Sequence, residues 1–424
     1  MTIAEQQPDG DTVDPPGGGR GRGRGPRRRL LPWKHRRNLT PEQLRRRRIA
    51  TRSALGVCLV CAGTVGWSVG KALTYPGSDS TEARLAEWAR DHELGFVVNR
   101  LENVQYRMNP PRVGGTLSAD ALARMKATSG ATAAAGAAPG DHAAAPGRPL
   151  VPMRSPLRPP VSPALPGEGV YRTLSSARGE PLVQGTYVRP DEDHTSYEAA
   201  VAWISGKYAR FQLHPGFMEP GGTFDVPPTI PKGQRTGLVA TWNGGFRITD
   251  GGSRGGFYLD GKTDGELRDG AASEVFSKDG SIKVGVWGRD VRMTPDVVGV
   301  RQCLELMVDG GKVVPDIDDG SKWGVADQGG MFVPRSGVGV TAQGDVIMVV
   351  GQALSAQSLA DLMQRAGAVR AMPLDMNRAW PSFMSYDGSH DPSDPVPTNI
   401  LDFEDPPNRY YVQATRDFVA VYAR

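Results

Sequence analysis

The spacing of apolar residues changes along the chain, and each pattern predicts a different element. An uncharged run, SALGVCLVCAGTVGWSV, opens the segment 53–74 and predicts one transmembrane helix. From 79 to 107, apolar residues recur at helical spacing on both sides of Gly95, which predicts a helical hairpin serving as a stalk. From 169 to 424, short apolar and aromatic runs alternate with turn residues, which is typical of β-strands.

Polar residues paired with glycine separate these short runs and predict hairpin turns. The pairs are Ser205-Gly206, Asp260-Gly261, Asp279-Gly280, Asp309-Gly310 and Gln343-Gly344. Turns of this kind join neighbouring antiparallel strands, so we expect a largely antiparallel sheet. The two aspartates of the Asp260 and Asp309 turns are therefore interpreted as turn residues rather than site residues.

One helix interrupts the strands. Its predicted N-cap is Ser355 and its predicted stop is Gly367. An apolar strand lies on each side, one beginning around Val346 and the other at 369–374. This strand, helix, strand order predicts a crossover connection, and with it a mixed α+β fold for residues 169–424. Asp375 then lies at the carboxyl end of a buried strand, where ligand sites of such sheets commonly form.

The charge of the chain is concentrated at its start. Residues 1–52 contain 14 Lys+Arg and 5 Asp+Glu, a balance of +9, which leaves −5 for the remainder of a chain whose total is +4. Arg, Gly and Pro dominate this segment, so we expect a disordered basic tail that meets anionic membrane lipid and no nucleic acid. The cluster 45–48 just before the apolar run predicts a cytoplasmic N-terminus and an extracellular C-terminal domain. A cleaved signal peptide is the alternative, although no small-x-small cleavage site follows the run.

Two further expectations concern the remaining segments. Residues 108–168 are rich in Ala, Gly and Pro, which predicts a flexible linker. Cys303 is the one cysteine after the apolar run, and we interpret it as a small buried hydrophobe rather than a reactive thiol.

Metal and cofactor chemistry have little support in the sequence. The six histidines are scattered without zinc-ligand spacing, and the acidic run 316–320 lacks the alternate-residue spacing of a calcium loop. Neither a Gly-x-Ser-x-Gly elbow nor a phosphate-binding Gly-Lys-Ser loop is present. We therefore expect no metal and no cofactor.

Four segments combine glycine with polar side chains: Asn243-Gly244-Gly245-Phe246, residues 257–262, residues 335–339 and residues 374–378. Their order and spacing, with an apolar strand and a helix between the last two, resemble the phosphodiester glycosidase family over roughly residues 187–424. The preceding segment LHPGFMEPGG is similar to the version found in bacterial envelope proteins.

The chain departs from the family after Asp375. The family typically has three glycines and a serine there, whereas this chain has Met376-Asn377-Arg378-Ala379-Trp380, with Ser382 a little later.

The resemblance implies a hydrolase that cleaves a sugar from a sugar-1-phosphodiester. Asp375 would act as base or nucleophile at the anomeric carbon, and Arg335 would bind the phosphate and stabilise the departing charge. Because a crossover returns the chain beside its starting strand, we expect these two side chains to share one pocket. Structural roles remain open for both, as an ion pair for Arg335 and as an acceptor of backbone N–H groups for Asp375.

The residues expected to bind the substrate are Asn243, Gly244, Gly245, Asn377, Arg378 and Ser382. For Asn243, a role in shaping the Gly-Gly turn is the open alternative. The bulky loop after Asp375 predicts a sugar-binding end of different shape. Together these expectations describe a membrane-anchored extracellular enzyme acting on a phosphorylated glycan of the cell envelope or an exported glycan. Two alternatives stay open: a non-catalytic module that binds phosphoglycan, and a structural protein of the cell envelope.

Overall fold

A computed structural model of the chain describes residues 40–134, 150–248, 252–323 and 331–424. It contains two compact units, Met1–Val65 and Gly66–Arg424. Within the described residues, one helix is long and apolar enough to span a membrane, the 34 residues of α1 (Pro41–Thr74). This helix begins at Pro41 rather than at residue 53, because Thr40 accepts a hydrogen bond from the Gln43 backbone N–H and proline favours the first helical position. Arg45–Arg48 are therefore helical, and the rest of the predicted tail, 1–39, lies outside the described residues.

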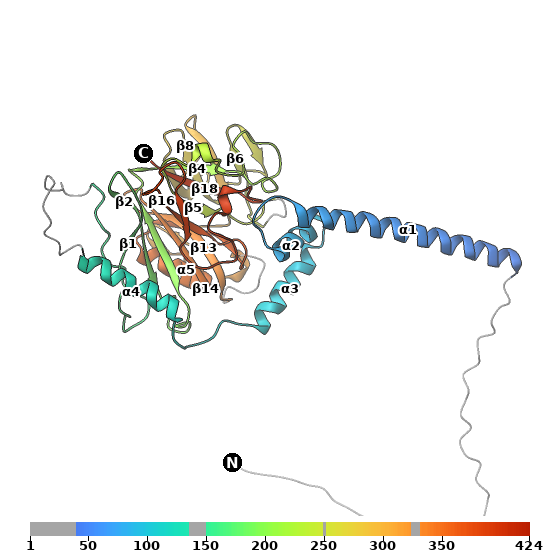
Figure 1. Cartoon of the computed structure of the whole chain (residues 1–424), viewed down its shortest axis with the longest axis horizontal. Coiled ribbons are helices and arrows are strands. Elements are labelled where there is room, and N and C mark those ends of the chain that lie inside the picture. The colour runs from blue at the N-terminus through green and yellow to red at the C-terminus, as the bar shows by residue number, and fades with distance from the viewer. Residues whose placement is uncertain (1–39, 135–149, 249–251, 324–330) are drawn as a thin grey trace, which may run out of the picture. The chain divides into compact units, whose positions relative to one another are not determined.

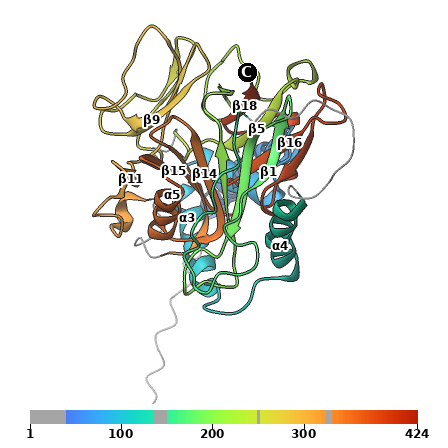
Figure 2. The ribbon, with the colours of Figure 1, turned by 90° about the vertical axis from the view of Figure 1, so that its left-hand side faces the viewer.

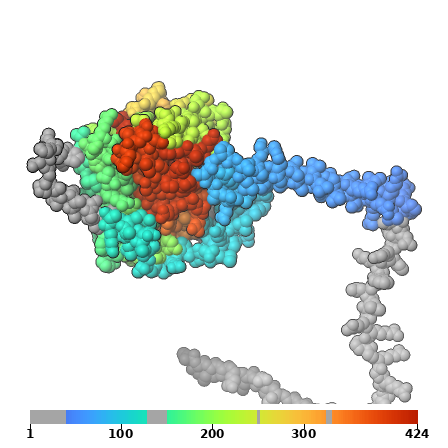
Figure 3. Space-filling view, viewed as in Figure 1, coloured from blue at the N-terminus to red at the C-terminus, as the bar shows by residue number. Residues whose placement is uncertain are grey.

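The hairpin predicted at 79–107 corresponds to helices α2 (Thr81–Asp91) and α3 (Gly95–Met108). The Ser80 hydroxyl caps α2 by accepting a hydrogen bond from the Ala83 backbone N–H. Arg84 fixes the approach to the hairpin by donating to the carbonyl oxygens of Tyr75, Gly77 and Asp79 at 2.6–2.9 Å. Both helices belong to the unit Gly66–Arg424 and lie against its folded body, next to C-terminal residues (Figure 1, Figure 3). The hairpin is therefore a packing element of this unit, and its role as a stalk stays a prediction.

The described residues of the folded body form three antiparallel sheets, which confirms the α+β prediction. The largest has eight strands in the spatial order β1 (Arg172–Ala177), β2 (Glu180–Val188), β3 (Ala199–Ile204), β14 (Val346–Leu354), β13 (Val333–Val340), β15 (Arg370–Met376), β11 (Val308–Asp309) and β12 (Lys312–Val313). A five-stranded sheet has the order β7 (Lys262–Asp264), β6 (Phe257–Leu259), β10 (Val297–Gln302), β8 (Ala272–Ser277) and β9 (Ile282–Val286). The other five-stranded sheet has the order β17 (Val396–Asn399), β16 (Phe383–Asp387), β5 (Leu238–Asn243), β18 (Phe418–Ala423) and β4 (Ala209–His214).

The hairpin turns were predicted correctly at four of the five positions. Antiparallel pairs β6–β7, β8–β9, β11–β12 and β13–β14 form around Asp260, Asp279, Asp309 and Gln343. The prediction at Ser205-Gly206 is wrong, because this turn leads from β3 in the large sheet to β4 in another sheet. The Gly206 N–H instead donates to the Asp345 carboxylate at 3.1 Å, which ties the turn to the β13–β14 loop.

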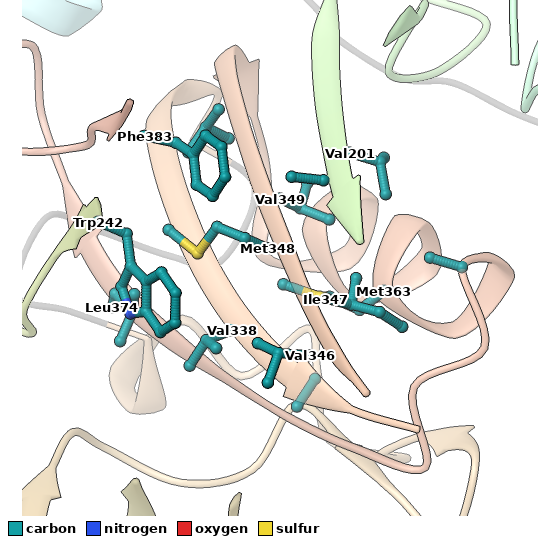
Figure 4. Close-up of a cluster of buried hydrophobic side chains, with 14 of the residues drawn as sticks. Val201, Trp242, Val338, Val346, Ile347, Met348, Val349, Met363, Leu374 and Phe383 are labelled. Atoms are coloured by element: carbon teal, nitrogen blue, oxygen red, sulfur yellow. The ribbon is translucent and has the colours of Figure 1, made fainter. Parts of the chain in front are cut away.

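The crossover prediction is confirmed by β14, helix α5 (Ala356–Arg365) and β15. Strand β13 lies between β14 and β15 and is antiparallel to both, so the two outer strands run in the same direction. Ser355 caps α5 by accepting from the Ser358 N–H at 3.0 Å, and Leu359, Leu362 and Met363 are buried. Met363, Val338 and Val346–Val349 belong to one buried cluster, which also includes Trp242 and Phe383 from a neighbouring sheet (Figure 4). This core holds the end of β15, and hence Asp375, in a fixed place.

The linker prediction for 108–168 is wrong in the parts that the structure describes. Helix α4 (Ala119–Ala134) packs on β2, and α4 and α5 lie toward opposite ends of the large sheet (Figure 2). Leu117, Ala121 and Met125 are buried at a spacing of four residues, which is a helical signal hidden by the Ala-rich composition. Arg124 pairs with Glu198. Residues 135–149 lie outside the described residues. The described ranges also contain three short 3₁₀ turns: η1 (Lys232–Gln234), η2 (Gly320–Lys322) and η3 (Arg409–Tyr411).

Candidate active site

Asp375 lies at the carboxyl end of β15 and is buried, with 4% of its surface exposed. One carboxylate oxygen, Oδ1, accepts a hydrogen bond from the Met376 backbone N–H at 2.7 Å. The other, Oδ2, accepts from Arg416 Nη1, also at 2.7 Å. Burial raises the pKa of the Asp375 carboxyl to about 7, although the Arg416 charge and the Met376 N–H act in the opposite direction. Asp375 therefore changes between its protonated and its ionised form near neutral pH.

A network of buried polar groups holds the backbone of Asp375 in position. The Ser336 hydroxyl lies 3.3 Å from both the backbone N and O of Asp375. Asn243 donates from Nδ2 to this hydroxyl at 3.1 Å and accepts at Oδ1 from the Ser382 N–H at 2.9 Å. The Ser382 hydroxyl in turn contacts that of Tyr410 at 2.8 Å. Asn243 and Ser382 therefore lie beneath Asp375 and connect its strand to β5 and β16, rather than facing a ligand.

Gly244 and Gly245 are also buried, and both are required for close packing. A Cβ at Gly244 would collide with the Asp417 carboxylate, which forms a fully buried ion pair with Arg301 (2.8 Å). A Cβ at Gly245 would lie 2.8 Å from the Cβ of Cys303. Burial raises the pKa of the Cys303 thiol to about 12, which agrees with its interpretation as a buried hydrophobe. These glycines thus bring the chain close to the buried ion pair and do not reach the surface of the site.

Arg416 connects Asp375 to the helical hairpin. Its Nη2 donates to Glu87 Oε1 of α2 at 2.8 Å, while Nη1 holds Asp375. The guanidinium also lies over the Trp380 ring, 3.9 Å from its centroid. Burial disfavours the charge of Arg416, but Glu87 and Asp375 outweigh this effect and raise its pKa. Arg416 is therefore a fixed cation at the acidic end of β15.

Glu87 lies among three arginines. Besides Arg416, it accepts from Arg247 Nη1 at 2.8 Å and from Arg90 Nη1 at 3.3 Å. Burial raises the pKa of the Glu87 carboxyl, but the three guanidinium groups overcome this and lower it below its ordinary value. Arg247 also pairs with Asp91 of the same hairpin. The carboxylate of Glu87 is consequently ionised and orients Arg247 and Arg416 next to Asp375.

A cavity of about 450 Å³ opens beside these groups. Its lining on the domain side includes Phe246, Arg247, Asp375, Met376, Asn377 and Arg416. Its lining on the hairpin side includes Arg90, Phe96, Asn99 and Glu102. The N-terminal hairpin therefore forms one wall of the cavity, and Asp375 belongs to the opposite wall.

The structure does not place Arg335 in this cavity, contrary to the expectation that it shares a pocket with Asp375. Arg335 donates from Nε to the Leu354 carbonyl oxygen at 2.8 Å and from Nη1 to Met376 Sδ at 3.3 Å. Ser336, the next residue, is the one that contacts Asp375. Burial lowers the pKa of Arg335 to about 10, and within the described ranges no carboxylate forms an ion pair with it. Its bonds to backbone carbonyls give it a structural role.

The loop after Asp375 divides between two cavities. Asn377, at φ 138°, lines the Asp375 cavity, and its Oδ1 accepts from the N–H groups of Ala379 and Trp380 at 2.9 and 3.2 Å. Asn377 therefore shapes the loop with one end of its amide. Arg378 is exposed and lines a separate cavity, where its Nε lies 3.9 Å from Glu404. Of the residues predicted to bind substrate, only Asn377 thus borders the cavity that contains Asp375.

Three residues of the site were not predicted: Glu87, Arg247 and Arg416. Arg247 directly follows the Asn243–Phe246 segment, and Arg416 stands beside Asp417 just before an apolar strand, so charged residues next to buried runs were the available signal. Glu87 shares the buried face of α2 with Ala83, four residues earlier. Across the described ranges, no group of three His, Cys, Asp or Glu side chains is arranged to hold a metal ion.

Comparisons with known proteins place this geometry in context. Residues 236–375 match the family model described as "Phosphodiester glycosidase". The matched segment contains Asn243, Arg247 and Arg335 and ends at Asp375. No curated protein matches the chain.

Several solved structures resemble the chain at low sequence identity. The catalytic domain of zebrafish N-acetylglucosamine-1-phosphodiester alpha-N-acetylglucosaminidase, auto-inhibited by its pro-peptide, is 13% identical over 60% of this chain and 88% of that chain, with a TM-score of 0.40. A hypothetical protein from Synechocystis is 12% identical over 58% and 63% of the two chains, with a TM-score of 0.34. A putative exported protein from Burkholderia pseudomallei K96243 is 12% identical over 53% and 74%, with a TM-score of 0.30.

Proposed function

Because the chain carries a phosphodiester glycosidase domain, matched over residues 236–375, we propose that it hydrolyses a sugar-1-phosphodiester at the bond between the anomeric carbon and the phosphate oxygen. The observation that carries this proposal is the position of Asp375 and two arginines at one cavity. Asp375 supplies a carboxyl group with a pKa near 7, and Arg247 and Arg416 supply cations suited to a phosphodiester.

The proposed reaction exchanges one bond at the anomeric carbon. The bond from this carbon to the phosphate oxygen breaks, and its electron pair leaves with the phosphate as a phosphomonoester. A water oxygen ultimately takes its place, either directly, with Asp375 accepting the proton of the water, or after Asp375 has attacked the carbon and the resulting ester is hydrolysed. In both routes only the ionised form of Asp375 reacts.

The two arginines act on the leaving group. A phosphomonoester gains negative charge as it departs, and guanidinium groups held in place before the reaction stabilise that charge without further rearrangement. Arg416 already donates to Asp375, and Glu87 fixes the direction of both guanidinium groups. Since phosphate is a good leaving group, these cations replace the acid that other glycosidases need for a sugar alcohol.

The pKa of Asp375 predicts how the rate depends on pH. Burial raises this pKa to about 7, so protonated and unreactive Asp375 dominates below that value. We expect kcat/KM to rise about tenfold for each pH unit at low pH and to level off above about pH 7. Stopped assays from pH 4 to pH 9 measure this profile. A rate that falls as Asp375 ionises would show that the group acts as an acid instead.

We also propose that α1 anchors the enzyme in the cell membrane, with its N-terminus in the cytoplasm and the C-terminal domain outside. The arginines at 45–48, before the apolar part of α1, support this orientation. Protease added to intact cells is expected to remove the C-terminal domain and leave the segment before α1 protected. Cleavage among Arg45–Arg48 in intact cells would show the reverse orientation, and with it a cytoplasmic substrate.

Turnover tests the proposed reaction directly. The full chain in detergent is incubated with methyl diesters of the α- and β-1-phosphates of glucose, galactose and N-acetylglucosamine, and ¹H and ³¹P NMR follow the products. We expect free sugar and methyl phosphate from at least one of these compounds. The proposed substrate in the cell is an extracellular phosphoglycan. Binding without turnover would favour the second candidate, a phosphoglycan-binding module, which is supported by the altered loop Met376-Asn377-Arg378 after Asp375.

A further inference from the structure

Helix α3 has its polar and apolar faces in the reverse of the usual arrangement. Val97, Leu101, Val104 and Met108 are exposed by 39, 64, 45 and 75%. The half-buried positions turned toward the domain are mostly polar, and they include Asn99, Glu102, Asn103 and Tyr106. A helix on a folded domain normally buries its apolar stripe, because this burial provides most of its packing free energy. The inward face of α3 is therefore occupied by side chains that do something other than fill a core.

The inward polar side chains meet the cavity that contains Asp375. Phe96, Asn99 and Glu102 all line it, and their spacing of three residues places them in one row along the helix. Glu102 accepts two hydrogen bonds from Arg90 Nη2, at 2.9 and 3.0 Å, and Arg90 also contacts Glu87. Glu102 is thus held by the same set of ion pairs that orients Arg416. Its side chain keeps 30% of its surface exposed, so part of the carboxylate still faces the cavity.

Asn99 provides a second polar group in this row. In the described part of the chain its amide has no hydrogen-bond partner, so both a donor and an acceptor are available to a ligand. Phe96 lies one turn earlier with an exposed ring. A carboxylate and an amide offer acceptors and donors for hydroxyl groups, and an aromatic ring beside them offers an apolar face for C–H groups. A pyranose ring presents both hydroxyl groups and a C–H face.

We propose that α3 is the sugar-recognition wall of the site. In this arrangement Glu102 and Asn99 bind hydroxyl groups of the sugar, Phe96 packs on its C–H face, and the opposite wall carries the reacting groups. The cavity of about 450 Å³ lies between the two walls, so the hairpin borders the substrate space without filling it. The assignment rests on the proposed hydrolysis of a sugar-1-phosphodiester, and it makes the N-terminal hairpin the part of the chain that selects the sugar.

Kinetics of Glu102→Gln and Asn99→Ala in the full chain test this assignment. With the best substrate of the six methyl diesters, we expect KM to rise about tenfold in each variant and kcat to stay within about a factor of two, because these groups bind the sugar and do not react. Leu101→Ala is the matched control on the outward face of the same helix and is expected to leave both constants unchanged. Melting curves accompany every variant, and Asn99→Ala breaks no ion pair, so the test survives if Glu102→Gln unfolds.

Deoxy sugars sharpen the test. For the diester that lacks the hydroxyl bound by Glu102, the parent and Glu102→Gln are expected to have the same KM, since the interaction is already missing. Unchanged KM in both variants with every diester would overturn the recognition wall while leaving the hydrolase intact. A rise in kcat/KM on substitution would also overturn it, because the hairpin would then be an obstacle to the substrate.

Binding measurements separate this inference from the proposed reaction. Saturation-transfer NMR with the same diesters reports binding without turnover. If the parent binds a diester without hydrolysing it, and Glu102→Gln weakens that binding, the recognition wall is supported and the hydrolase is not. If the parent neither binds nor hydrolyses any of them, both proposals are overturned.

Discussion

Replacing Asp375 by Asn is expected to reduce kcat for the sugar-1-phosphodiester by about a thousandfold with the fold intact. The amide keeps the shape of the carboxylate but can neither accept a proton from water nor attack the anomeric carbon. The introduced amide has one acceptor oxygen, which can keep the hydrogen bond from the Met376 N–H, while its NH2 group takes the place of the oxygen that accepts from Arg416. KM is expected to change little, because the sugar is held by the opposite wall.

Asp387→Asn is the matched control for this change. Asp387 also lies at the end of a strand, β16, but is exposed and bonds only within its turn, to the Ser389 N–H at 2.9 Å. We expect its rate to equal that of the parent. An Asp375→Asn variant that melts like the parent and hydrolyses the substrate at the parental rate would remove Asp375 from the mechanism.

Replacing Arg416 by Lys is expected to lower kcat/KM about a hundredfold. Arg416 reaches Asp375 with one nitrogen and Glu87 with the other, at 2.7 and 2.8 Å. An ammonium group retains the charge but cannot span the two carboxylates in one plane. The cation is therefore misplaced relative to the departing phosphate, and Asp375 loses the donor that orients it.

Arg335→Lys is the control, because it makes the same change at another buried arginine. The Arg335 guanidinium bonds the Leu354 carbonyl oxygen and Met376 Sδ and does not line the Asp375 cavity. We expect it to lower the melting temperature and to leave kcat/KM within a few-fold of the parent. The opposite outcome, an inactive Arg335→Lys that stays folded beside an active Arg416→Lys, would return the phosphate site to Arg335.

The regular elements around Asp375 were predictable because their signals are local. The Ser355 cap, the apolar spacing of α5 and the polar–glycine turns each lie within a few residues of the structure that they specify. The place of Asp375 at the carboxyl end of β15 follows from these signals. The wrong turn at Ser205-Gly206 shows their limit, since a local signal does not state which sheet the next strand joins.

The side-chain partners in the site could not be predicted because they come from distant parts of the chain. Arg416 meets Asp375 across 41 positions and meets Glu87 across 329. The face on which Arg335 lies depends on a register shift between Arg335 and Gly337 in the pairing of β13 with β15. Such a bulge changes the alternation of faces without an unambiguous sequence signal. A charged residue on an amphipathic helix normally indicates solvent, so the local sequence does not mark Glu87 as part of the site.

Hydrolysis in ¹⁸O-labelled water tests the central claim most directly, because it identifies the bond that breaks. The full chain is incubated with its best methyl diester in H₂¹⁸O. The products are separated quickly, and their masses are measured by mass spectrometry. Cleavage at the anomeric carbon places ¹⁸O on the sugar and leaves the methyl phosphate unlabelled, and this is the result that we predict. Label in the methyl phosphate, with an unlabelled sugar or sugar phosphate, would show attack at phosphorus and would contradict a glycosidase.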